Sequence, residues 1–177
     1  MDVGASTGGF TDCLLQNGAE KVYAVDVGYG QLDWKLRNDP RVICRDRKNA
    51  RTLSKEDIGE TLDLAVIDVS FISLQLVIPP LLKILKPEGQ LVALVKPQFE
   101  VGKNDMEHRG VIKDPAKHIA VLLKLNRFIE EKEWSVINAT ESPITGQKGN
   151  REFLIHCVDN RYGKPVEENT LRKIVRN

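Results

Sequence analysis

The sequence has few cysteines and no long apolar run, which argues against a disulfide-rich, zinc-binding or membrane-spanning protein. The 177 residues include only Cys13, Cys44 and Cys157, which are widely spaced in apolar surroundings. This pattern argues against a disulfide framework and a zinc site, and it predicts reduced thiols in the core. No apolar segment approaches the roughly 18 residues of a membrane span, and no signal sequence precedes the first glycine-rich segment. We therefore expect a cytoplasmic protein without a transmembrane segment.

A strong imbalance of charge is also missing. The net charge is +1, from 26 basic and 25 acidic residues, so binding to nucleic acid would have to come from a local patch. One such patch lies between Lys35 and Lys55, where eight basic residues accompany two acidic ones. It is either a solvated face or a surface for a polyanion. The hydrophobic content of 41% suits one compact domain over residues 1–177.

The segment D-V-G-A-S-T-G-G-F-T, from Asp2 to Thr11, has the pattern of a strand end, a glycine-rich turn and the start of a helix. Glycines let the backbone approach a ligand closely, but their spacing is not the G-x-G-x-x-G of dinucleotide sites. Asp2 could anchor an amino group or the amides of the turn. These features favour a cofactor with an amino acid moiety, such as S-adenosylmethionine. The expected cofactor contacts here are Asp2, Gly4, Ala5, Ser6, Thr7, Gly8, Gly9 and Phe10.

Short β-branched runs alternate with helical segments along the chain. Strands are predicted at residues 22–25, 41–44, 64–67, 91–95, 134–139 and 152–158, and helices at 10–17, 31–38, 54–59, 73–86 and 115–133. Pro79 and Pro80 are expected to start or kink the fourth helix. The alternation predicts an α/β fold with a doubly wound, mostly parallel seven-stranded sheet and a terminal antiparallel strand, the Rossmann-like fold of S-adenosylmethionine-dependent methyltransferases. A central strand needs about five residues, yet only Met1 precedes Asp2, so we expect the sequence to be a fragment or to begin at a wrongly assigned start.

Ligands of such sheets bind at the carboxyl ends of the strands, where this chain has several polar residues. Asp26 follows the second strand and could accept hydrogen bonds from both ribose hydroxyls of a nucleoside cofactor. The alternative is a turn residue before Gly28. Asn49, after the third strand, could line an adenine pocket or cap the turn before Arg51.

Three further residues are candidates for catalysis. Asp68 and Lys96 follow neighbouring strands and should face each other, either to assist deprotonation of a hydroxyl or as a structural ion pair. Glu152 begins the last strand, after a glycine-containing turn that could border the substrate site. The segment from Phe99 to Asp114 is long enough for a lid, and its His108 is expected to be solvated rather than a catalytic base.

These motifs together resemble those of the TlyA family, haemolysin-named proteins related to the FtsJ-like ribosomal RNA 2′-O-methyltransferases. The resemblance covers nearly all of the chain through the Asp2–Thr11 segment, A-V-D-V-G-Y-G-Q-L, D-V-S-F-I-S-L, K-P-Q-F-E-V-G, S-P-I-T-G and G-N-R-E-F-L. The wider group uses a Lys-Asp-Lys-Glu tetrad, whose aspartate, second lysine and glutamate fall on Asp68, Lys96 and Glu152. The family's first lysine and its small RNA-binding domain would precede the glycine turn.

The resemblance implies metal-free methylation of a ribose 2′-oxygen, in a cytidine, with ribosomal RNA within ribosomal subunits as the partner. In that reaction Lys96 assists loss of the hydroxyl proton, while Asp68, which also borders the cofactor, and Glu152 orient the lysines. The alternatives are a module that binds cofactor and RNA without catalysis, a membrane-lytic haemolysin and a small-molecule methyltransferase. The lack of a basic amphipathic helix disfavours the haemolysin, and the basic patch disfavours a small-molecule substrate.

Overall fold

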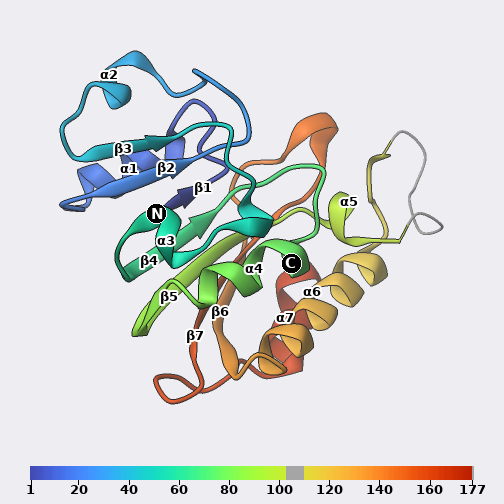
Figure 1. Ribbon diagram of the computed structural model, residues 1–177. Helices are drawn as coiled ribbons and strands as arrows, with labels where there is room; N and C mark the ends of the chain where they lie inside the picture. Colours follow the sequence, from blue (N-terminus) through green and yellow to red (C-terminus); the bar gives the residue numbers. More distant parts are fainter. Residues whose placement is uncertain (103–109, 177) are drawn as a thin grey trace.

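A seven-stranded sheet forms the centre of the protein in the computed structural model, which describes residues 1–102 and 110–176 (Figure 1). The strands are β1 (Asp2–Val3), β2 (Val22–Val25), β3 (Val42–Arg45), β4 (Leu62–Ile67), β5 (Leu85–Val95), β6 (Trp134–Glu141) and β7 (Phe153–Asp159). Their order across the sheet is β3-β2-β1-β4-β5-β7-β6. Strands β1 to β5 pair in parallel, whereas β7 is antiparallel to both β5 and β6. This confirms the predicted fold.

Helices connect the strands, and two of them were not expected from the sequence. The helices are α1 (Gly9–Gln16), α2 (Trp34–Arg37), α3 (Lys55–Ile58), α4 (Leu74–Leu82), α5 (Pro97–Glu100), α6 (Pro115–Glu130) and α7 (Glu168–Arg176), with short 3-10 helices η1 (Ala50–Thr52) and η4 (Gln147–Gly149). The unexpected helices are α5, a single turn, and α7. The spacing of the buried Leu171 and Val175 four residues apart was the available signal for α7.

The predicted boundaries were wrong at two helices. Helix α2 is limited to one turn, and α4 ends at Leu82 rather than at Lys86. Strand β5 begins at Leu85, well before the predicted start at Leu91, so it takes up the residues assigned to the end of that helix. Pro79 and Pro80 lie inside α4, where each lacks the N–H group of a helical hydrogen bond.

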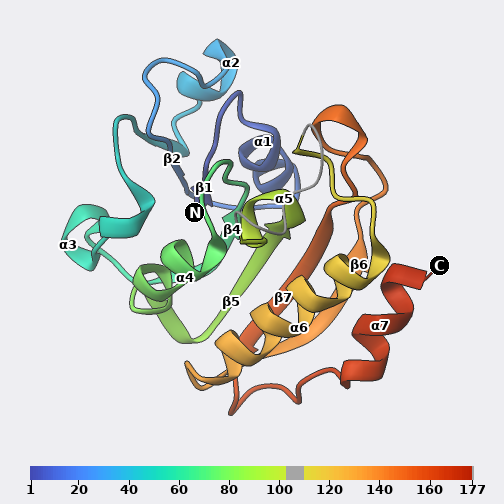
Figure 2. The same cartoon turned by 90° about the vertical axis from the view of Figure 1, so that its right-hand side faces the viewer.

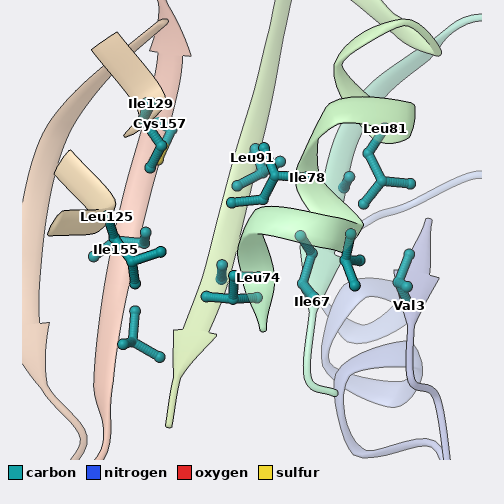
Figure 3. Close-up of a cluster of buried hydrophobic side chains, with 14 of the residues drawn as sticks. Val3, Ile67, Leu74, Ile78, Leu81, Leu91, Leu125, Ile129, Ile155 and Cys157 are labelled. Carbon is teal, nitrogen blue, oxygen red and sulfur yellow. The ribbon is translucent and has the colours of Figure 1, made fainter. Parts of the chain in front are cut away.

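The two faces of the sheet are covered by different helices (Figures 1 and 2). Side chains alternate between the faces along a strand, so Val3 packs into the main hydrophobic cluster while Asp2 points to the opposite face and meets α1. Figure 3 shows the main cluster, in which Leu74 and Ile78 of α4 lie against Leu91 of β5. This arrangement places the start of α1 and the start of α4 at the same edge of the sheet, beside the ends of β1 and β4.

The cysteines differ from the expectation of three core thiols. Cys157 is buried, but Cys44 is half-buried and Cys13 is exposed on α1. Burial raises the pKa of the Cys157 thiol, which suppresses the reactive thiolate. The prediction was wrong for Cys13 because the short helix turns that side chain away from the sheet.

This difference predicts selective thiol labelling. A chromogenic disulfide reagent should modify Cys13 rapidly in the folded protein, and Cys157 only after denaturation, because the reaction needs an accessible thiolate. Peptide mapping of the labelled protein would measure this, with Cys13→Ser as the control. Equal labelling rates at Cys13 and Cys157 under native conditions would contradict the burial of Cys157.

Two absences hold for the part of the chain that the structure describes. Among residues 1–102 and 110–176, no helix is long and apolar enough to cross a membrane. Within the same ranges, no group of three or more histidine, cysteine or acidic residues could hold a metal ion. His108 lies outside the described residues, as does most of the central part of the expected lid.

Candidate cofactor site and active site

The glycine turn after β1 packs directly against the end of β4. The amides of Gly4 and Ala5 both donate to the carbonyl of Val25, at 2.9 and 3.1 Å. Gly4 has a φ of +85°, and a Cβ atom there would lie 2.1 Å from the backbone oxygen of Asp68. Only glycine therefore permits this approach of the two strand ends.

A pocket of about 350 Å³ opens between this turn, the end of β2 and the segment after β4. Five of the residues expected at the cofactor line it, namely Gly4, Ser6, Asp26, Asn49 and Asp68. The other six do not line it, namely Asp2, Ala5, Thr7, Gly8, Gly9 and Phe10. Gln31 and Lys48 also line the pocket, and the sequence had not indicated either of them.

Asp2 lies below the turn rather than in the pocket. It is 1% exposed, and its Oδ2 accepts a hydrogen bond of 2.7 Å from the Thr11 hydroxyl of α1. Its Oδ1 has no hydrogen-bond partner among the described residues. Burial raises the pKa of this carboxyl, and the bond from Thr11 lowers it in part. In this structure the carboxylate therefore joins β1 to α1.

Asp26 holds the turn and its own loop together. Its Oδ2 accepts the amide of Ser6 at 2.9 Å, and its Oδ1 accepts the amide of Gly28 at 2.7 Å. The turn interpretation is thus observed. A carboxylate oxygen has more than one acceptor position, so these bonds leave capacity for ligand hydroxyls.

Asn49 combines the two roles that the sequence left open. Its side chain accepts the amide of Arg51 at 3.0 Å, which caps η1. The same residue lines the pocket.

Lys96, Asp68 and Ser70 meet at the ends of β5 and β4. The Lys96 ammonium lies 2.5 Å from Oδ1 of Asp68 and donates to Oγ of Ser70 at 3.1 Å. The Lys96 side chain is 13% exposed and that of Asp68 is 36% exposed. The two residues face each other as the sequence predicted, because β4 and β5 are parallel neighbours that end at the same edge.

Glu152 joins this group from the position directly before β7, which begins one residue later than predicted. The antiparallel register pairs Val95 with Phe153, so Glu152 lies next to Lys96 across the sheet. Burial raises the pKa of Glu152, and the charge of Lys96 and a 3.5 Å hydrogen bond from Gln98 lower it in part. The three predicted catalytic residues are therefore brought together.

Gly146 provides the space for this carboxylate. A Cβ at Gly146 would lie 1.9 Å from Oε1 of Glu152, so the turn before β7 approaches the acid closely because it lacks a side chain there.

A second pocket, of about 800 Å³, continues from the first on the side of β7. Ser70 and Phe71 line both pockets. Phe71 is 85% exposed with a φ of +63°, and its ring lies 4.9 Å from that of Phe99, centroid to centroid. Positive φ is unusual for a bulky residue, and no feature of the sequence pattern indicated it.

Asn150 organises the far wall of this second pocket. Its buried side chain accepts the amide of Ile112 at 3.0 Å and donates to the carbonyls of Gly110 and Gln147 at 3.2 and 3.1 Å. It thereby ties the segment before α6 to the turn before β7, which is the turn that was expected to border a substrate site. The sequence had indicated the turn that contains Asn150 but not the bonds that this side chain makes.

Some of the bases in the patch between Lys35 and Lys55 are paired with acids. Arg37 pairs with Asp46 and Arg41 with Asp39 inside the patch, and Lys48 pairs with Asp57 just beyond it. The Arg47 guanidinium lies 4.6 Å from the centre of the exposed Tyr29 ring. Through Lys48 the patch reaches the smaller pocket.

The sheet order, the glycine turn after β1 and the acidic residue after β2 define the class of Rossmann-like methyltransferases. A solved structure from Listeria monocytogenes, provisionally described as an S-adenosylmethionine-dependent methyltransferase, shares this fold with a TM-score of 0.63 at 14% identity over 89% of both chains. Residues 1–158 match the family model of the FtsJ-like methyltransferases. The chain belongs to this family.

Closer relatives carry the names expected from the sequence motifs. The Mycobacterium tuberculosis protein named 16S/23S rRNA (cytidine-2′-O)-methyltransferase TlyA is 48% identical over 155 residues, which cover 88% of this chain and 58% of that protein. A solved structure from Streptococcus thermophilus, provisionally named a hemolysin, is 45% identical with a TM-score of 0.94, and the match covers 99% of this chain and 64% of that one. The chain spans less than two thirds of the length of the curated relatives it matches first.

Proposed function

We propose that the protein transfers a methyl group from S-adenosylmethionine to a ribose 2′-oxygen, in a cytidine of ribosomal RNA. The observation that carries the proposal is the Lys96–Asp68 ion pair, bound to Ser70 where the two pockets meet. The name of the M. tuberculosis relative supports the substrate.

The smaller pocket suits the cofactor. Asp26 would accept the ribose hydroxyls, and Asn49 would border the adenine. Gly4 and Ser6 also line this pocket, so the rest of the cofactor would lie against the glycine turn. Bound S-adenosylmethionine supplies an electrophilic methyl group.

The larger pocket suits the nucleotide that accepts the methyl group. The exposed ring of Phe71 provides a flat surface on which an unstacked base can stack, as single-stranded RNA commonly does on aromatic side chains. In the reaction, Nζ of Lys96 contacts the ribose 2′-oxygen and assists loss of the hydroxyl proton. Asp68 and Glu152 orient Lys96 from the ends of the neighbouring strands. The protein acts mainly by alignment, which can contribute roughly 7–11 kcal/mol.

The test uses the complete natural protein and two measurements. Calorimetry measures binding of S-adenosylmethionine, and transfer of tritium from its methyl group to ribosomal subunits measures catalysis. Nuclease digestion should then release a labelled 2′-O-methyl nucleoside. Cofactor binding without transfer would identify a binding module, and label on a base would contradict the assignment of the 2′-oxygen.

The raised pKa of Glu152 predicts how the rate of methyl transfer falls at acidic pH. As pH falls, this carboxyl gains its proton above the usual pH for glutamate, and the proposed orientation of Lys96 is lost. We expect kcat of the wild type to decline with falling pH before the protein unfolds. In Glu152→Gln, whose amide does not titrate, kcat should be low at every pH and this decline should be missing. Single-turnover rates between roughly pH 5 and 8 cover the usual range of such shifts; an unchanged acidic limb in the variant would contradict the role.

A further inference from the structure

A buried carboxylate outside the proposed reaction links the two segments that carry Lys96 and Asp68. Glu100 ends α5, four residues after Lys96, and is 5% exposed. Its Oε1 accepts the amide of Leu74 at 2.7 Å, and its Oε2 accepts the hydroxyl of Ser73 at 2.7 Å. Both partners belong to the start of α4, which follows Asp68. The side chain therefore crosses from the segment after β5 to the segment after β4.

Burying this acid is unfavourable, so its position needs an explanation. Burial raises the pKa of Glu100, and the bonds from Leu74 and Ser73 lower it in part. Ser73 already caps α4, since its hydroxyl accepts the amide of Gln75 at 3.2 Å. Glu100 caps the same helix from another segment. Unlike a local cap, it also fixes the distance between the segment after β4 and the segment after β5.

The residues between the two ends of this link are those of the proposed active site. The segment from Asp68 to Leu74 contains Ser70, which binds Lys96, and the strained Phe71. The segment from Lys96 to Glu100 contains Phe99, which packs on Phe71. The two segments are therefore joined at both ends. Near the strands they are joined by the Lys96–Ser70 bond and the contact between the Phe71 and Phe99 rings, and further on by the two hydrogen bonds that Glu100 accepts. Loss of the Glu100 bonds would let Lys96 and Phe71 move relative to each other.

We propose that Glu100 is a positioning residue, which holds the Lys96 segment against the Asp68 segment so that Lys96 is aligned with the methyl acceptor. The alignment role rests on the proposed function, whereas the coupling of the two segments does not. Glu100 itself lines neither pocket, so its effect would be indirect.

The test is Glu100→Gln, which keeps the shape but replaces one acceptor oxygen with a donor. We expect kcat per folded molecule to fall about tenfold, since small misplacements of reacting groups have effects of this size or larger, while KM for S-adenosylmethionine stays near the wild-type value. Ser73→Ala, which removes one of the two bonds, should cause a smaller fall. The two changes together should lower kcat by less than the product of their separate effects, because they act on one link.

A matched control separates positioning from general loss of stability. Ser135 donates a partly buried hydrogen bond of 2.6 Å to Asn160 at the opposite end of the sheet. Ser135→Ala should lower the melting temperature without changing kcat per folded molecule. If Glu100→Gln lowers kcat only in proportion to its folded fraction, the positioning role is overturned.

Hydrogen exchange tests the coupling by Glu100 separately from the proposed methyl transfer. In Glu100→Gln, exchange should become faster in both residues 69–74 and residues 97–101, with no change in β6. If the wild type transfers no methyl group, the proposed function fails, and this exchange result still decides the coupling. Faster exchange in only one of the two segments would overturn the coupling even in an active enzyme.

Discussion

Lys96→Ala should abolish methyl transfer and leave the affinity for S-adenosylmethionine nearly unchanged. The variant removes the group that, in the proposed reaction, assists loss of the hydroxyl proton, and general acid–base groups contribute about 10²–10⁴-fold to rate. Lys96 lines neither pocket, so the cofactor contacts should remain. Its partner Asp68 is 36% exposed and can be solvated when the ammonium is absent. The variant should therefore fold.

The measurement is the single-turnover rate on ribosomal subunits, together with the calorimetric Kd of the cofactor. Lys86→Ala is a matched control. Lys86 forms a 2.6 Å ion pair with Asp63 between the same two strands, β5 and β4, but near the starts of these strands and away from the proposed site. This control should keep the wild-type rate. Turnover by Lys96→Ala close to that of Lys86→Ala would rule out the proposed role and leave the Lys96–Asp68 pair as a structural ion pair.

Gly4→Ala should eliminate measurable cofactor binding. The new methyl group would lie 2.1 Å from the backbone oxygen of Asp68, in a residue with a φ of +85°. Positive φ alone costs a non-glycine residue roughly 1–2 kcal/mol. The overlap adds to this, because a backbone oxygen cannot rotate away. The turn would have to move off the end of β4, and the pocket that lies between them would change shape.

Gly18→Ala separates the two causes. Gly18 has a φ of +89°, but no atom lies within 4 Å of its added Cβ. It should lose stability from the backbone conformation alone and keep its cofactor affinity. Calorimetry and thermal unfolding of both variants would measure this, with Gly4→Ala examined below its own melting temperature. A normal Kd in folded Gly4→Ala would show that the close approach is not needed for binding.

The residues at the strand ends could be recognised from the sequence because their positions follow from local patterns. A buried strand is visible as a β-branched run, so the residue after it, such as Asp26, Asp68 or Lys96, is placed at the ligand-binding edge of the sheet. The glycine turn was recognised in the same way. Six of its expected cofactor contacts nevertheless do not line the pocket, because the period of two along β1 turns Asp2 toward α1 and the start of the helix turns other residues away.

The residues missed by sequence reasoning depend on contacts between distant segments. Phe71 has a positive φ and an exposed ring, and its ring packs against that of Phe99 from another segment. Asn150 lies in a turn that the sequence had indicated, but its bonds to Gly110 and Ile112 join that turn to a segment far away along the chain. Glu100 lies in one of the motifs, but no local pattern predicts its link, since both of its partners lie 26 or more residues away. The single turn of α5 is too short to produce a periodic signal.

The sequence by itself determined the class of fold and the glycine turn, and it placed the candidate residues Asp68, Lys96 and Glu152 at the ends of strands, since each follows from strand periodicity or from a motif of adjacent residues. Only the tertiary structure decided that Glu152 lies beside Lys96, that two pockets meet at Ser70 and that Glu100 links the Asp68 and Lys96 segments. The physical reason is that these contacts join segments far apart along the chain. Their geometry depends on strand register and loop packing, which are set by the free energy of the whole molecule and not by a local pattern.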